Sequence, residues 1–162
     1  MHRCARAWLP TWLRGQRCSG RIIFALLAEA YGKVGQAEEG LTVLAEPLLD
    51  LVHETGERVA GAELYRVKGT LTLQSQVQGP RAKVEAEAEG CFWKALEMAR
   101  QQSAKSWELR AVISLSRLWQ SQGKKAEAHR MLAEIYGWFT EGFDTKDLQE
   151  AEALLKGSIM SS

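Results

Sequence analysis

Three stretches of the chain repeat the same spacing of large and small residues. In each stretch, large apolar side chains recur at helical intervals around one small residue, and a second apolar stretch follows after a turn. The small residues are Ala28, Gly69 and Ser116. Two antiparallel helices need a small residue where they pack closely, so each stretch predicts a helix pair. Repetition of such pairs predicts a solenoid, in which each pair buries its apolar face against the next one.

The same pattern predicts an all-α fold of three antiparallel helix pairs and a C-terminal capping helix. The expected helices are 21–33 with 36–53, 57–76 with 84–102, 103–122 with 124–136, and 146–156 at the end. Pro47 removes a backbone donor and predicts a kink in the second helix. Gly40 is expected to weaken that helix by roughly 1 kcal/mol relative to alanine. Gly79 and Pro80 predict an exposed loop over residues 75–83.

The last pair of a solenoid exposes an apolar face that must be covered. Four aromatic residues precede the closing helix, and three leucines lie on it. These residues are Tyr136, Trp138, Phe139 and Phe143, with Leu148, Leu154 and Leu155. We expect the aromatic side chains to pack with the leucines onto the last pair.

Composition fits one globular domain. The chain has 162 residues, a length sufficient to bury a core. Its content of 46% hydrophobic and 25% charged residues is ordinary for a globular protein. It divides into an atypical basic arm (1–20), a repeat domain (21–157) and a short tail (158–162). No apolar run is long enough to cross a membrane, and Pro10 interrupts any signal-peptide core, so the expected location is cytoplasmic.

Charge is uneven along the chain, although the formal net charge is only +1. Residues 1–21 hold five of the 21 basic side chains and none of the 20 acidic ones. The repeat domain is therefore mildly acidic, unlike a nucleic-acid-binding domain. Trp8 and Trp12 among the arginines leave open a contact with nucleic acid or an anionic membrane, but cover of the first helix pair is the favoured interpretation. We expect neither nucleic acid nor membrane as a partner.

Residues with the spacing of a catalytic or metal site are not found. The three cysteines are Cys4, Cys18 and Cys91, and the three histidines are His2, His53 and His129. An odd number of cysteines without a C-x-x-C pair argues against a disulfide framework and a zinc site, and the histidines lack partners at i+3 or i+4. The glutamates 85, 87 and 89 are expected to form a solvated face. We therefore expect the chain to have no enzymatic activity and to bind no cofactor and no metal ion.

Four short segments carry a resemblance to a known family. They are AELYRVKG at 62–69, CFWKAL at 91–96, AKSWELRA at 104–111 and YGWFTEGFDT at 136–145. They resemble tetratricopeptide (TPR) repeats, and more narrowly the C-terminal TPR region of bacterial proteins that join an ATPase to a nucleotide-cyclase or DNA-binding domain. The resemblance covers about residues 21–156 and implies a regulatory or scaffolding segment without catalytic activity. Its small residues recur after 41 and 47 positions, against about 34 in a TPR unit, which predicts longer helices and loops.

In TPR-like arrays the first helix of each pair lines a concave groove. The residues three positions before, one position after and four positions after the small residue then face the groove. Arg110, one turn before Ile113, is added to them. The predicted partner-binding residues are Glu29, Arg66, Thr70, Leu73, Arg110, Ile113, Arg117 and Gln120. Guanidinium groups match carboxylates through paired donors, so an acidic or C-terminal peptide is the expected ligand. The alternative is that the arginines pair with Glu63, Glu108 or Glu29 on neighbouring helices.

The leading hypothesis is a non-catalytic scaffold that binds a protein or peptide segment in this groove. A small-ligand-sensing regulatory domain is one alternative, and a self-associating structural module, a homo-oligomer, is another. A dry hollow lined by aromatic side chains would favour the small ligand. A shallow, charged groove would favour the peptide.

Overall fold

The computed structural model describes residues 19–44, 58–75 and 79–159. The described elements are α1 (Ser19–Lys33), α2 (Ala37–Val43), α4 (Arg58–Gln74), α5 (Arg81–Gln101), α6 (Lys105–Ser121), α7 (Lys125–Tyr136) and α8 (Lys146–Ile159). These ranges contain helices and no strand, which confirms the all-α prediction. None of these helices is long and apolar enough to span a membrane.

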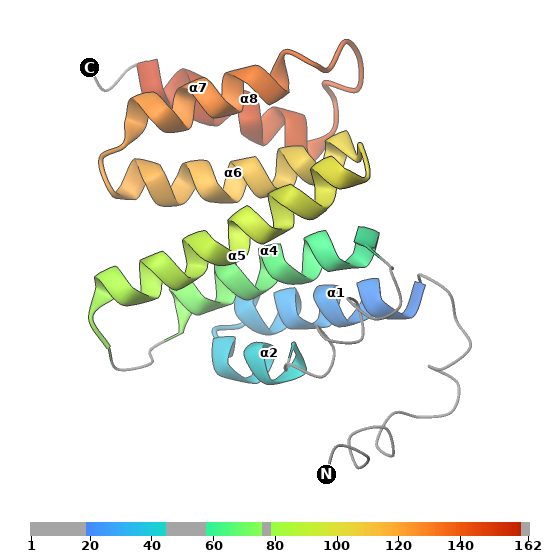
Figure 1. Cartoon of the computed structure of the whole chain (residues 1–162), viewed down its shortest axis with the longest axis vertical. Helices are drawn as coiled ribbons and strands as arrows, with labels where there is room; N and C mark the ends of the chain where they lie inside the picture. The colour runs from blue at the N-terminus through green and yellow to red at the C-terminus, as the bar shows by residue number, and fades with distance from the viewer. Residues whose placement is uncertain (1–18, 45–57, 76–78, 160–162) are drawn as a thin grey trace.

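The helices are stacked in chain order, from α1 and α2 at one end to α7 and α8 at the other (Figure 1). Helices α1, α4, α6 and α8 each contact the next of the four, and we call this continuous series the helix row. Each of α2, α5 and α7 contacts the two members of the row that precede and follow it in the chain. Every helix thus buries apolar surface against its neighbours in sequence, and the core extends along the stack.

Gly69 and Ser116, two of the predicted small residues, lie where two helices approach closely. A Cβ atom on Gly69 of α4 would be 3.0 Å from the carbonyl oxygen of Ala88 in α5 and 2.7 Å from Cε1 of Phe92. The Ser116 hydroxyl of α6 donates a hydrogen bond of 3.3 Å to the carbonyl oxygen of Ala128 in α7. The small residues therefore have the packing role that the sequence predicts.

Gly40 has a packing role that the sequence prediction missed. A Cβ atom there would be 2.8 Å from Cδ1 of Leu71 in α4 and 3.0 Å from the carbonyl oxygen of Ala28 in α1. Glycine weakens a helix, but here it lets α2 approach both neighbours. The rest of the second predicted helix, with Pro47, lies outside the described residues.

The C-terminal end is covered largely as expected. Leu148 and Ala151 of α8 are buried, and Tyr136, Phe139, Leu154 and Leu155 pack at the edge of the core. Trp138 and Phe143 are exposed, which the prediction had wrong. Each still contacts another ring: Trp138 lies 5.3 Å from Phe139 and Phe143 lies 5.7 Å from Tyr136, between ring centroids.

Helix α5 begins three residues earlier than predicted. Pro80 immediately precedes it with a φ of −59°, and its carbonyl oxygen accepts hydrogen bonds from the backbone N–H groups of Lys83 and Val84. Proline is preorganised for a helix start and has no N–H group to leave unpaired. Residues 81–83 of the predicted loop are therefore helical, and residues 76–78 lie outside the described residues. The N-terminal arm 1–20 lies outside the described residues, apart from the backbone of Ser19 and Gly20 in α1.

Candidate functional site

A buried carboxylate organises the charged residues of the helix row. Glu63 of α4 is only 2% exposed. It accepts hydrogen bonds of 2.9 Å and 2.8 Å from Nε and Nη2 of Arg66 on the same helix. Nη1 of Arg110 on α6 lies 2.9 Å from the same carboxylate. A buried charge is tolerated only with such partners, so Glu63 fixes both guanidinium groups and ties α4 to α6.

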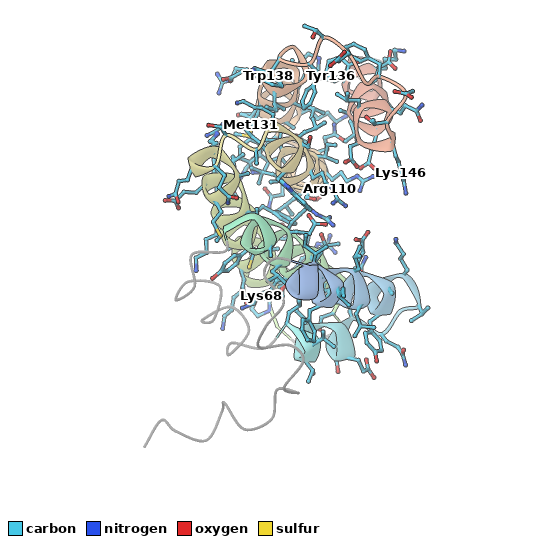
Figure 2. The ribbon with its side chains drawn as sticks, turned by 90° about the vertical axis from the view of Figure 1, so that its right-hand side faces the viewer. Lys68, Arg110, Met131, Tyr136, Trp138 and Lys146 are labelled. Atoms are coloured by element: carbon cyan, nitrogen blue, oxygen red, sulfur yellow. The ribbon has the colours of Figure 1, made fainter. Side chains whose placement is uncertain are left out.

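The ion pairs continue from this centre to both ends of the row. Arg66 Nη2 lies 3.4 Å from a carboxylate oxygen of Glu29 on α1, and Glu29 also pairs with Lys33 at 3.4 Å. In the other direction, Arg110 Nε lies 3.6 Å from Oδ2 of Asp147 on α8. Figure 2 shows Arg110 on the same side of the molecule as Lys146, the residue before Asp147.

The pKa of Arg66 reflects this environment. Burial lowers the pKa, but the hydrogen bond to Glu63 and the surrounding carboxylates outweigh burial and raise it above its ordinary value. The guanidinium group therefore stays charged and stays occupied by protein carboxylates. For Arg66 and Arg110 the structure shows the pairing that the sequence left open as the alternative.

A hollow of about 470 Å³ opens beside this network, between α1, α4, the start of α5 and α6. Five of the eight predicted groove residues line it: Glu29, Arg66, Thr70, Leu73 and Arg117. The floor is apolar, with Val67, Leu71, Phe92 and Leu118. The rim is polar and charged, and among the described lining residues Phe92 is the one aromatic side chain.

The other three predicted residues lie elsewhere. Arg110 pairs with Glu63 and Asp147. Ile113 is buried in the core, so its side chain cannot meet a partner. Gln120 is half-buried on α6 and does not line the hollow.

Three exposed cations at the rim are better placed to meet a solute than Arg66. Their side chains are exposed by 70% in Lys33, 84% in Arg81 and 58% in Arg117, against 12% in Arg66. Each has a carboxylate partner: Lys33 pairs with Glu29, Arg81 with Glu85, and Arg117 with Glu150 of α8. Exposed ion pairs are weak, so these cations can exchange partners.

Lys33 and Arg81 were not predicted, because only certain offsets in the first helix of each pair were assigned to the groove, and Arg81 lies on α5, a second helix. The pair between Glu63 and Arg110 was expected only as one of several alternatives, although a more specific signal was present. Glu63 precedes Gly69 by the same number of residues as Arg110 precedes Ser116. Equal offsets in two contacting helices of the row, with opposite charges, favour an ion pair between these two residues.

Of the three glutamates at the start of α5, Glu87 is exposed as expected, whereas Glu85 and Glu89 are half-buried and paired with other side chains. Glu85 accepts a hydrogen bond of 3.0 Å from the side-chain amide of Gln122, and Glu89 accepts one of 3.0 Å from the indole N–H of Trp119. The bonds to Glu85 from Gln122 and then from Arg81 lower the pKa of its carboxyl group. These side chains connect α5 to α6.

Within the described residues, no group of three His, Cys, Asp or Glu side chains is placed to hold a metal ion. Cys91 is buried and not in a disulfide. Cys4, Cys18, His2 and His53 lie outside the described residues.

A scan of the chain against protein-family models finds no match, and searches of the curated proteins and of the solved structures find none either. The TPR resemblance therefore stays a prediction from the residues alone.

Proposed function

We propose that the chain is a TPR-like solenoid of three antiparallel helix pairs with a capping helix. In this proposal it acts as a non-catalytic, cytoplasmic scaffold that binds an acidic peptide segment of a partner protein at the hollow. One observation carries the binding site: consecutive members of the helix row share one hollow with an apolar floor and an exposed cationic rim.

The close helix contacts support a repeated unit. They join Ala28 to Gly40, Gly69 to Ala88, and Ser116 to Ala128. The first and third contacts each join residues 12 positions apart, and the second joins residues 19 positions apart. The longer interval falls in the pair that contains α5, the longest of the described helices, and the residues between α4 and Pro80. A repeat with one insertion accounts for this difference.

The lining of the hollow favours a peptide over a small ligand. Its volume lies within the range of small-molecule pockets, about 300–1,000 Å³, but such pockets are predominantly apolar and aromatic. Here charged and hydroxyl side chains surround an apolar floor that has one aromatic ring. An extended peptide could place an apolar side chain on the floor and acidic side chains at the rim.

The charges at the rim favour an acidic ligand. Lys33, Arg81 and Arg117 are exposed there, against the two carboxylates Glu29 and Glu85. Carboxylates of a peptide would gain charge-assisted hydrogen bonds from these groups, and the positive rim would attract the peptide from solution.

The proposal is tested with a fluorescein-labelled dodecapeptide of alternating Glu and Ala, with a Gln-Ala peptide as its uncharged counterpart. Replacing Lys33 and Arg117 together by glutamine is expected to weaken anisotropy-detected binding of the acidic peptide about tenfold or more. The matched control replaces Lys125 and Arg130 together by glutamine, which removes two exposed cations of α7 away from the hollow. Arg66 is unsuitable for this test because its loss would leave Glu63 with fewer partners. Unchanged binding in the double variant would move the site elsewhere.

A further inference from the structure

Helix α8 supplies carboxylates to two arginines of the predicted groove. Glu150 pairs with Arg117, and Asp147 lies 3.6 Å from Arg110. The two acidic residues are three positions apart, so they lie on the same face of α8. The apolar residues Leu148 and Ala151 hold this helix against the rest of the molecule.

We propose that Glu150 is an internal competitor for the acidic partner. Its carboxylate occupies the guanidinium group of Arg117, which a partner carboxylate would otherwise take. A partner must therefore displace Glu150 before it can use Arg117, and the residue lowers the affinity of the site for every acidic ligand. This inference rests on the proposed function of the hollow.

The exposed fractions of the Glu63 and Glu150 ion pairs support the proposal that Glu150 can be displaced. Glu63 is 2% exposed, so solvent and solutes do not reach the carboxylate that holds Arg66 and Arg110. The pair between Arg117 and Glu150 has side-chain exposures of 58% and 25%, so water and solutes reach both groups. Exposed pairs are weak and open readily. Glu150 can therefore be displaced where Glu63 cannot.

Displacement requires only a movement of the Glu150 side chain. Leu148 and Ala151 flank this residue and are buried, so α8 stays in place when the ion pair opens. The expected effect is accordingly modest. Removing the competing charge should tighten the binding of an acidic ligand about two- to fivefold, the range that corresponds to one exposed ion pair. A ligand without carboxylates should gain nothing.

The test uses the full chain, the labelled Glu-Ala dodecapeptide and its Gln-Ala counterpart. Glu150→Gln is compared with Glu152→Gln, which makes the same charge change on the same helix. Glu152 pairs with Lys156 of α8 and not with α6, so it is a matched control. We expect two- to fivefold tighter binding of the acidic peptide to Glu150→Gln and a smaller change for Glu152→Gln. The gain should disappear when Arg117→Gln is added, because Glu150 acts through that residue.

Each other outcome has a definite meaning. Equal gains in Glu150→Gln and Glu152→Gln would overturn the inference, since net charge alone would explain them. Binding that depends on Arg117 but is the same in Glu150→Gln and wild type would overturn the inference and leave the proposed function standing. Absence of binding of the acidic peptide to wild type and to every variant would overturn both.

Discussion

The face that α1 turns away from the stack differs from the corresponding face of α4. Ile23 and Leu26 of α1 are each 55% exposed. Leu64 and Val67 occupy the same offsets from the small residue in α4 and are 0% and 1% exposed. In α4 this face is covered by α1 and α2, whereas among the described elements none precedes α1. Apolar side chains at the same offsets are thus buried in α4 and exposed in α1, because α4 has a neighbouring helix on this face.

The C-terminal end sharpens this contrast. Helix α8 has buried apolar residues toward the core, Leu148 and Ala151, and exposed polar residues such as Gln149 and Glu152 on its outer side. Leu27 of α1 and Val34, the residue directly after α1, extend the exposed apolar face at the other end. A helix that closes an array needs a polar outer face, and α8 has one while α1 does not.

The largest expected effect compares two equivalent positions. Leu64→Ala should lower the free energy of unfolding by about 2–5 kcal/mol, because it leaves a cavity in the core. Ile23→Ala, at the same offset in α1, should change it by no more than about 0.5 kcal/mol. Urea denaturation of both variants at one pH measures the difference.

Equal losses in the two variants would contradict the comparison. They would mean that Ile23 is covered in solution as Leu64 is. Sedimentation of wild type at several concentrations would then show whether a second copy of the chain covers it.

A smaller effect is expected from two glycines of the same helix pair. Gly69→Ala places a methyl group against Phe92 and the backbone of Ala88, and overpacking of this kind costs about 1–3 kcal/mol. Gly90→Ala in α5 meets no atom within 4 Å and should gain up to about 1 kcal/mol from its better helix propensity.

Thermal unfolding of the two glycine variants measures this pair of effects. A lower melting temperature for Gly69→Ala and an unchanged or higher one for Gly90→Ala is the expected result. Stabilisation of both variants would show that the helices at Gly69 can move apart without cost, and that close approach does not define the repeat.

The sequence predicted the helices and the contact residues because both follow from local patterns. Ala28, Gly69 and Ser116 stand out as small residues in apolar surroundings. Turn residues such as Gly123, whose φ is +81°, mark where helices end. The start of α5 was missed because proline next to glycine also suits a loop. Local signals therefore fix element type better than element limits.

The candidate site was predictable only in part, because side-chain exposure depends on how each helix is rotated in the stack. Arg66 and Arg117 were treated as equivalent, yet Arg66 meets a buried glutamate and Arg117 faces solvent. The offset rule also placed Ile113 in the groove, whereas this side chain is buried in the core. Positions in the repeat indicate neighbours, but not which neighbour takes which charge.

The smallest expected effect concerns a buried charge of the covered interior, Glu108 at the start of α6. It accepts hydrogen bonds of 2.9 Å from Arg100 of α5 and 2.7 Å from Lys105. Burial raises the pKa of Glu108, but these two bonds outweigh burial, so the pKa is held below its ordinary value of 4.5.

A lowered pKa in the folded state means that the ionised carboxyl group stabilises the fold above the unfolded pKa, and that this stability is lost as the pH falls through the folded value. The unfolding free energy of wild type should therefore exceed that of Glu108→Gln by a margin that is constant near neutral pH and shrinks below about pH 4.5. Urea denaturation of both proteins between pH 7 and pH 3 measures the margin. A margin that does not change with pH would show that Glu108 stabilises the fold through its shape and not through its charge.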